Sequence, residues 1–202
     1  MKWCPRLSMN MRLATFAVCL ALSACSSTPP AAPAQDLASI LNRFEVVRDA
    51  MQLPHVRLSL EPNPFIAAAK GFGTLVMDEP FALSLSDPAL NYVLMHEFAH
   101  LKHQDPRRGM ETLRKIHASK RTEAEAEPEQ DFMQLWGKYN QEPEFLNMLR
   151  EVEGRADEYA VDYLNRLGQD ACAASEELEL KTGRSFGDRI DAVCGRTQLN
   201  LE

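Results

Sequence analysis

The sequence has no excess of positive charge. Its 22 lysines and arginines are outnumbered by 29 aspartates and glutamates, which gives a formal net charge of −7. Residues 1–25 contain three cations and no acid, so without them the net charge changes from −7 to −10. Nucleic acid and anionic lipid surfaces both attract lysine and arginine. We therefore expect neither as a partner.

Long apolar runs are also scarce. The main one, Leu13–Leu22, is much shorter than the ~20 residues that a transmembrane helix needs, and no other segment approaches that length. The run follows a start with three basic residues and precedes the small residues Ser23 and Ala24. These are the three parts of a signal sequence. We predict that residues 1–24 form a signal peptide.

The end of this signal resembles the lipobox of bacterial lipoproteins. In Leu22-Ser23-Ala24-Cys25 the chain would be cut before Cys25, which would then be acylated. The alternative is an ordinary secretory signal with an incidental cysteine. A lipoprotein is favoured because Ser26–Pro33 follows as a flexible tether. Acyl chains each bury many methylenes, at ~0.8 kcal/mol apiece, so two or more hold a protein on a bilayer.

The rest of the chain suffices for one folded domain. We assign residues 25–35 to the lipidated Cys25 and its tether, and residues 36–202 to a single domain with one core. Ser26 resembles lipoproteins exported to the outer membrane, which usually lack Asp at that position. The expected location is the bacterial cell envelope, at the outer membrane facing the periplasm.

Cysteine is rare, and most of it is accounted for by the N-terminus. Cys4 and Cys19 leave with the signal, and Cys25 would carry lipid. Cys172 and Cys194 remain, and an even pair in an exported protein favours a disulfide. It would staple the C-terminal segment onto the helices of the site. Metal binding by this pair is the weaker alternative, because no close C-x-x-C spacing is present.

Apolar spacing indicates an α+β fold that is mostly helical with a small sheet. Recurrence every three or four positions predicts helices at Asp36–Leu53, Asp87–Asp105, Glu142–Leu167, Ala171–Lys181 and Phe186–Cys194. Alternation predicts strands at His55–Leu60, Phe72–Met77 and Phe81–Ser86. Asp87 is expected to cap its helix. The charged stretch Lys120–Gln130 is expected to be a solvated surface excursion.

The most informative feature is the H-E-x-x-H motif at His96-Glu97-Phe98-Ala99-His100, inside a predicted helix. Residues four apart share a helix face about 6 Å apart along the axis, so both imidazoles can bind one metal ion. Glu97 then lies beside the metal, where it can take a proton from metal-bound water. This is the hydrolytic arrangement of zinc metallopeptidases. Because the motif also arises by chance, a third ligand has to support it.

The third ligand is predicted on the next long helix. Glu153 and Asp157 are four residues apart, so both can face the motif helix. Glu153 would complete a His₂Glu zinc site, and Asp157 would accept the second N–H of a ligand histidine. This spacing alone is also common on solvated helix faces. Glu151 is disfavoured because Arg155 lies four residues later, and His103 because it lies about 10.5 Å along the helix from His96.

Three stretches resemble the zinc metallopeptidase family that includes HtpX and the CAAX prenyl proteases, specifically its small exported or lipoprotein branch. Asn63–Ala67 resembles the family's Asn-x-Phe-Ala segment before an edge strand, Leu85–His100 its motif helix, and Glu153–Ala160 its E-x-x-A-D signature. The resemblance implies a gluzincin-type metallopeptidase domain over residues 36–202. It also implies one Zn²⁺ per chain and cleavage of peptide bonds in protein substrates.

Carried over residue by residue, the resemblance implies that His96, His100 and Glu153 bind zinc. Glu97 would be the general base and Asp157 would orient a ligand histidine. The chain departs from the family downstream, where a Thr-His-Pro-Pro stretch is often found. Its Thr182–Ile190 stretch has glycine in place of that histidine.

The oxyanion of the reaction would then need another stabilising group. Arg184, Arg189 and Tyr159 are candidates, although each is more often structural. Weak activity or a narrow substrate range would follow if none of them serves.

These features predict a zinc endopeptidase that acts on unfolded or misassembled proteins of the cell envelope. Substrate would lie extended along Phe72–Met77 and pair through its backbone. The alternative for that segment is a plain core strand. The alternative for the whole protein is a zinc-binding chaperone or adaptor lipoprotein that holds clients and cuts little. The missing downstream histidine favours this second function, and intact Glu97 opposes it.

Overall fold

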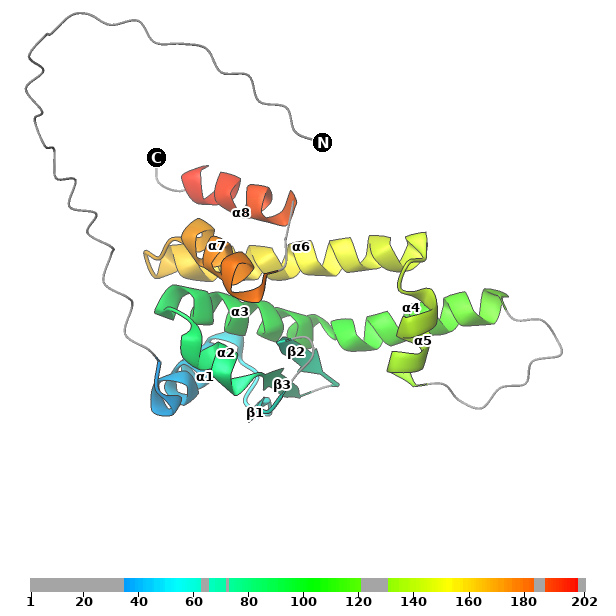
Figure 1. Cartoon of the computed structure of the whole chain (residues 1–202), viewed down its shortest axis with the longest axis horizontal. Helices are drawn as coiled ribbons and strands as arrows, with labels where there is room; N and C mark the ends of the chain where they lie inside the picture. The colour runs from blue at the N-terminus through cyan, green and yellow to red at the C-terminus, as the bar shows by residue number, and fades with distance from the viewer. Residues whose placement is uncertain (1–34, 63–65, 72, 121–130, 184–187, 200–202) are drawn as a thin grey trace, which may run out of the picture. The chain divides into compact units, whose positions relative to one another are not determined.

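The protein is described by a computed structural model over residues 35–62, 66–71, 73–120, 131–183 and 188–199 (Figure 1). The predicted signal peptide, Cys25 and most of the tether lie outside the described residues. So do Arg184 and nearly all of the predicted surface excursion at 120–130.

The described chain is mostly helical with one small sheet, which confirms the predicted fold class. Its helices are α1 (Leu37–Met51), α2 (Glu79–Ser84), α3 (Asp87–His103), α4 (Asp105–Lys120), α5 (Phe132–Tyr139), α6 (Pro143–Arg166), α7 (Ala171–Thr182) and α8 (Asp188–Leu199). Its strands are β1 (Arg57–Leu60), β2 (Ala67–Lys70) and β3 (Thr74–Met77). Within these residues no helix has both the length and the apolar character needed to cross a membrane.

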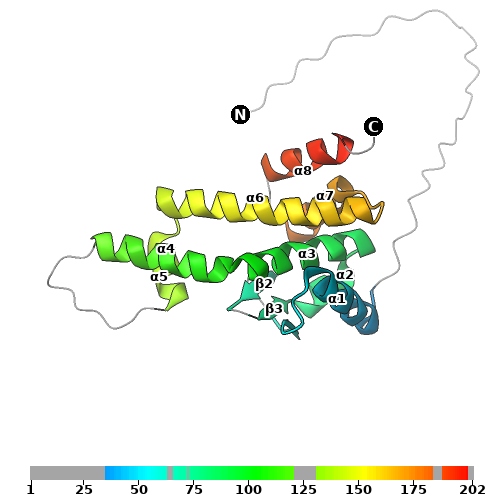
Figure 2. The same cartoon turned by 180° about the vertical axis from the view of Figure 1, so that it is seen from behind.

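Helix α3 is the centre of the fold. Every residue from Ala89 to Leu101 is buried, because α6 and α7 pack against α3 and so do α1 and β2. Figures 1 and 2 show α3 and α6 side by side. The N-cap of α3 is Ser86, whose Oγ accepts a hydrogen bond from the Ala89 N–H, so the predicted cap was one residue late. The helix ends at Gln104, whose φ of 56° is left-handed.

The sheet has the order β1-β3-β2, with β1 parallel and β2 antiparallel to β3. Strand β3 corresponds to the prediction at Phe72–Met77, but it is the central strand and is paired on both sides. It therefore offers no free edge to a substrate, which corrects that prediction. The edge strand β2 was not predicted. Its sequence, Ala-Ala-Ala-Lys, lacks alternation and has the composition of a helix.

The predicted strand at Phe81–Ser86 is wrong, because Glu79–Ser84 forms helix α2. Phe81, Leu83 and Leu85 alternate with smaller residues, which gave the strand pattern. The signals for the start of a helix outweigh this alternating pattern. The Asp78 carboxylate accepts a hydrogen bond from the Phe81 N–H at 3.0 Å, and a proline occupies the first turn.

The described residues form two hydrophobic clusters. The larger one includes Phe44, Leu94 and Phe98 and joins α1, the sheet, α3, α7 and the C-terminal half of α6. The smaller one lies among α4, α5 and the N-terminal half of α6 and includes Leu135 and Phe145. Helix α6 therefore belongs to both clusters.

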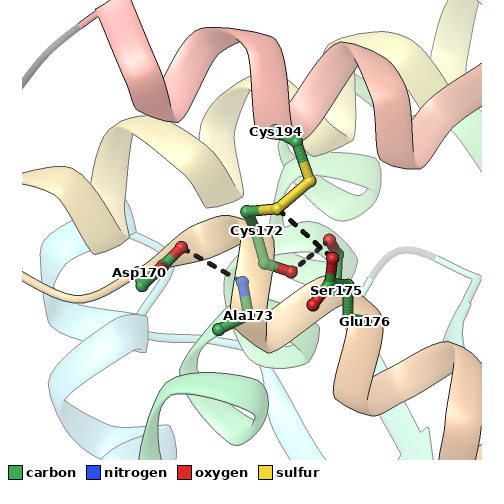
Figure 3. Close-up of a disulfide and its surroundings, with 6 residues drawn as sticks. All are labelled: Asp170, Cys172, Ala173, Ser175, Glu176 and Cys194. Carbon is green, nitrogen blue, oxygen red and sulfur yellow. Dashed lines mark hydrogen bonds between the residues drawn. A yellow bond between two sulfur atoms is a disulfide. The ribbon is translucent and has the colours of Figure 1, made fainter.

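The predicted disulfide between Cys172 and Cys194 is present and joins α7 to α8. In Figure 3, Cys194 points from α8 toward Cys172 in the first turn of α7. The Asp170 carboxylate caps that turn by accepting a hydrogen bond from the Ala173 N–H. The bridge thus fastens α8 to its neighbour in sequence, while α8 itself also packs against α6.

Candidate metal centre

Helices α3 and α6 bring three predicted ligands together. The Nε2 atoms of His96 and His100 are 3.1 Å apart. One carboxylate oxygen of Glu153 lies 3.5 Å from His96 Nε2, and the other lies 3.6 Å from His100 Nε2. Two ligands of a tetrahedral zinc with bonds of ~2.05 Å are separated by ~3.3 Å. The spacing of the donor atoms therefore fits one zinc ion.

The kinds of donor also fit a catalytic zinc. Two imidazole nitrogens and one carboxylate oxygen are three protein ligands, which leaves a fourth position for water or substrate. A second group among the described residues joins Cys172, Glu176 and Cys194. Its two sulfurs are bonded to each other, so it does not offer thiolates to a metal.

Each histidine has a carboxylate at its other ring nitrogen. His96 Nδ1 lies 3.0 Å from an oxygen of Asp157, although the approach is not aligned for a regular hydrogen bond. His100 Nδ1 lies 2.9 Å from Oδ2 of Asp105, and the other oxygen, Oδ1, accepts a hydrogen bond from Arg155 at 2.5 Å. A carboxylate in this position fixes the ring orientation and makes the other nitrogen a better ligand.

Asp105 is the residue that the sequence prediction missed. Asp105-Pro106 indicated the end of a helix, and α3 does end there, but α4 begins at once at Asp105. The left-handed conformation of Gln104 turns the chain so that the Asp105 side chain comes back toward His100. The available signal was an acid five residues after the second histidine, which indicates a contact only once that turn is known.

The two residues that were disfavoured as ligands lie away from the centre. Glu151 forms a two-pronged ion pair with Arg108, at 2.7 and 2.5 Å, on an exposed face. His103 contacts the Tyr159 hydroxyl at 3.1 Å. Tyr159 was a candidate for oxyanion stabilisation, but it does not line the cavity that contains the metal centre.

Arg189, the other described candidate for that role, is held by two carboxylates. Its Nε and Nη2 each donate to Asp157 at 2.8 Å, and its Nη1 lies 2.8 Å from Glu153. The Tyr92 hydroxyl also donates to Asp157, at 2.9 Å. Helix α8 therefore contributes a cation to a centre that is otherwise built from α3, α4 and α6.

The charges in the metal-free centre are strongly coupled. Burial favours the neutral form of Glu153, but contacts with His96 and Arg189 outweigh it and lower the pKa of Glu153 to about 2. Burial lowers the pKa of His96, and the carboxylates of Asp157 and Glu153 outweigh this and raise it to about 10. The pKa of Asp157 is also lowered, since His96 and Arg189 outweigh its burial. Without metal, one proton on His96 partly balances the two anions.

The metal centre opens into a cavity of about 1190 Å³. Glu97 lines this cavity together with His96, His100 and Glu153, and so does the whole of β2. Beyond the centre is a surface that we call the apolar wall, formed by Met110, Phe132, Met133, Trp136, Phe145, Met148 and Leu149. Glu97, the candidate metal ligands, strand β2 and an apolar surface therefore line one space.

Two histidines one helical turn apart, with a glutamate from a second helix, define the gluzincin class of zinc metallopeptidases. The sequence matches the profile of peptidase family M48 over residues 32–193, most of the chain, and the protein belongs to that family. Searches of curated proteins and of solved structures gave no significant match. Family membership confirms the resemblance seen in the sequence at this level. The lipoprotein branch stays a prediction.

Proposed function

We propose that this metallopeptidase is a zinc endopeptidase of the bacterial cell envelope, which cleaves unfolded or misassembled proteins. The observation that carries the proposal is that Glu97 and the His96–His100–Glu153 centre share one large cavity with an edge strand. A long polypeptide can enter such an open space, and the enzyme need not recognise the chain terminus of its substrate.

The residues divide the chemistry among themselves. Bound by His96, His100 and Glu153, Zn²⁺ would polarise a peptide carbonyl and make a water molecule more acidic. Glu97 would accept the proton of the attacking water and pass it to the leaving nitrogen as the peptide bond breaks. Asp157 and Asp105 hold the two imidazoles at their other nitrogens, so the ligand geometry is set before substrate arrives.

Strand β2 is the edge that a substrate backbone would pair with. One side of β2 is paired with β3, in the register Ala67–Met77 to Lys70–Thr74, and β2 lines the cavity. An extended peptide added to an edge strand is recognised through its main chain. Such pairing tolerates many sequences but requires an unfolded segment, which fits a role in quality control.

The apolar wall supports the same class of substrate. Met133 is 54% exposed although it is large and apolar, and it lines the cavity together with the partly buried Phe132 and Trp136. Methionine side chains adapt to differently shaped apolar groups. Unfolded proteins expose the apolar side chains that folded proteins bury, so the wall would favour them over folded ones.

An envelope location is part of this proposal. The lipobox ending at Cys25 supports a lipid anchor, and the Cys172–Cys194 disulfide supports an oxidising compartment. We expect Cys25→Ser to release the protein from the membrane fraction of its bacterial host, and mass spectrometry of the wild type to find acyl chains on Cys25. Unchanged membrane association of Cys25→Ser would remove the anchor from the proposal.

The activity is tested with a permanently unfolded substrate, such as a reduced and alkylated casein, and the zinc-loaded protein. Wild type should produce internal cleavage, and a chelator should abolish it. Glu97→Gln should bind zinc as wild type does and lose about 100-fold or more of the rate, because it keeps the shape of the side chain but cannot accept a proton. Equal turnover by wild type and Glu97→Gln would overturn the mechanism. Substrate binding by both without turnover would favour a chaperone or adaptor.

A further inference from the structure

We propose that Arg189 is a positioning residue of the metal centre, and that the Cys172–Cys194 disulfide holds it in place. This inference rests on the zinc site of the proposed function. Arg189 contacts Glu153, a predicted zinc ligand, and Asp157, which faces another, His96. One guanidinium therefore spans the carboxylate that binds the metal and the carboxylate that orients a ligand histidine.

Glu153 needs such a partner more than the histidines do. Its side chain is 31% exposed, whereas those of His96 and His100 are 11% and 10% exposed. A partly exposed glutamate has several rotamers available, and only those that face both imidazoles bind the metal. Two hydrogen bonds to Asp157 fix the plane of the Arg189 guanidinium, and its Nη1, 2.8 Å from Glu153, then favours such a rotamer.

Arg189 depends in turn on the placement of α8. The burial of the α8 side chains is described for residues 189–195, and among these only Val193 is buried. A helix of 12 residues is marginal in water by itself, so α8 depends on what it packs against and what it is bonded to. The disulfide joins Cys194, five residues after Arg189, to the well-packed α7. It therefore limits how far Arg189 can move from the two carboxylates.

The test compares zinc affinities, measured by competition with a chromogenic chelator, in the full-length mature protein. Arg189→Met keeps much of the side-chain length but removes the donors, and we expect it to weaken zinc binding about 10–100-fold. Arg189→Lys keeps the positive charge but not the two parallel donors to Asp157, so we expect most of the same loss of zinc affinity. The Co²⁺ absorption bands of Arg189→Met should also shift, because they report the ligand geometry directly.

Arg108→Met is the matched control. Arg108 lies on α4 and donates two hydrogen bonds to the carboxylate of Glu151, which is on α6 like Glu153 and Asp157. Arg108 does not line the cavity. We expect wild-type zinc affinity and Co²⁺ bands. Far-UV circular dichroism and thermal unfolding of every variant separate a loss of fold from a loss of positioning.

The disulfide is tested by the double variant Cys172→Ala/Cys194→Ala. We expect a loss of zinc affinity in the same direction as for Arg189→Met and no larger. When all three substitutions are combined, the affinity should equal that of Arg189→Met, because the disulfide acts through Arg189. Additive losses would overturn the disulfide part of the proposal.

Two results would separate this inference from the proposed function. If wild type fails to bind zinc, the metal site itself is wrong. If wild type binds zinc and a folded Arg189→Met binds it equally well or more tightly with unchanged Co²⁺ bands, the zinc site stands and the positioning role of Arg189 is wrong.

Discussion

The two halves of helix α6 differ in what they pack against, and the metal centre lies where they meet. The N-terminal half contributes Phe145, Met148 and Val152 to the small cluster with α4 and α5. The C-terminal half contributes Ala156, Ala160 and Leu164 to the large cluster around α3. Glu153 lies between the last residue of the first set and the first of the second.

This comparison shows how a carboxylate is accommodated between two apolar cores. Most of the buried residues of α6 are apolar, but Glu153 and Asp157 face His96, His100 and Arg189. Buried or half-buried acids are tolerated where cations or hydrogen-bond donors surround them. The segment from Glu153 onward should therefore govern metal binding, and the segment before Glu153 should govern stability and the shape of the cavity.

The largest expected effect is that of Glu153→Ala. It removes a metal ligand, so zinc affinity should fall by more than about 100-fold, beyond the usual effect of an outer partner, and proteolysis should be lost. Glu151→Ala is the control, two residues earlier on the same helix but paired with Arg108. Its zinc affinity and activity should match wild type in chelator competition and casein cleavage. A similar loss in both variants would contradict the assignment of Glu153.

Phe145→Ala tests the other half of α6. Phe145 is 1% exposed and contacts the Trp136 ring edge-on, so its removal should destabilise the protein by about 3–5 kcal/mol in urea unfolding. Phe145→Leu, which fills more of the space, should cost less than the alanine variant. The zinc affinity of the folded fraction should be unchanged in both Phe145 variants. A zinc affinity below that of wild type, measured per folded molecule, would mean that the two segments of α6 do not act independently.

Asp105→Asn tests whether the carboxylate beside His100 strengthens metal binding. The amide keeps the shape of the side chain but no longer offers an anion to His100 Nδ1, so zinc affinity should fall about 10–100-fold. Asp157→Asn should have an effect of the same order through His96. Isothermal titration with zinc measures both. Wild-type affinity of Asp105→Asn would show that its contact with His100 does not matter to the metal.

The pH dependence gives the smallest effect. Above the ordinary pKa of 6.5 and below its folded pKa of about 10, His96 keeps a proton in the metal-free protein that zinc has to displace. Glu153 stays ionised in this range, because its pKa is lowered to about 2. Zinc affinity, corrected for the chelator, should therefore rise about tenfold from pH 7 to pH 8. No change would mean that His96 is already neutral.

The same shift has a consequence for the metal-free protein. Because the folded pKa of His96 is raised, its contribution to stability is fully present below about pH 6.5 and is lost as the pH rises through about 10. The melting temperature of the metal-free protein should fall over this range, and zinc should reverse the fall. A metal-free melting temperature that rises with pH would contradict the raised pKa.

The sequence was most informative where helical spacing alone decides which side chains meet. His96 and His100 share a face of α3, and Glu153 and Asp157 share a face of α6, whatever the rest of the fold does. The positions of Asp105 and Arg189 were not predictable in this way. Asp105 depends on the left-handed turn at Gln104, and the contacts of Arg189 depend on where α8 is tethered.

The sheet was the least predictable part, because its strands are only four residues long. Alternation over such short runs also occurs in helices, which explains the error at Phe81–Ser86. Strand β2 is stabilised by its pairing with β3 and not by the β-propensity of its alanines. Its position beside the cavity therefore follows only from the tertiary structure.

X-ray absorption at the zinc edge of the purified zinc-loaded protein tests the central claim most directly. The account predicts one zinc per chain, bound only by nitrogen and oxygen at ~2.0–2.2 Å with the signature of two imidazoles, and loss of that zinc in Glu153→Ala. Sulfur at ~2.3 Å, which would assign the metal to Cys172 and Cys194, or a zinc retained unchanged in Glu153→Ala, would contradict it.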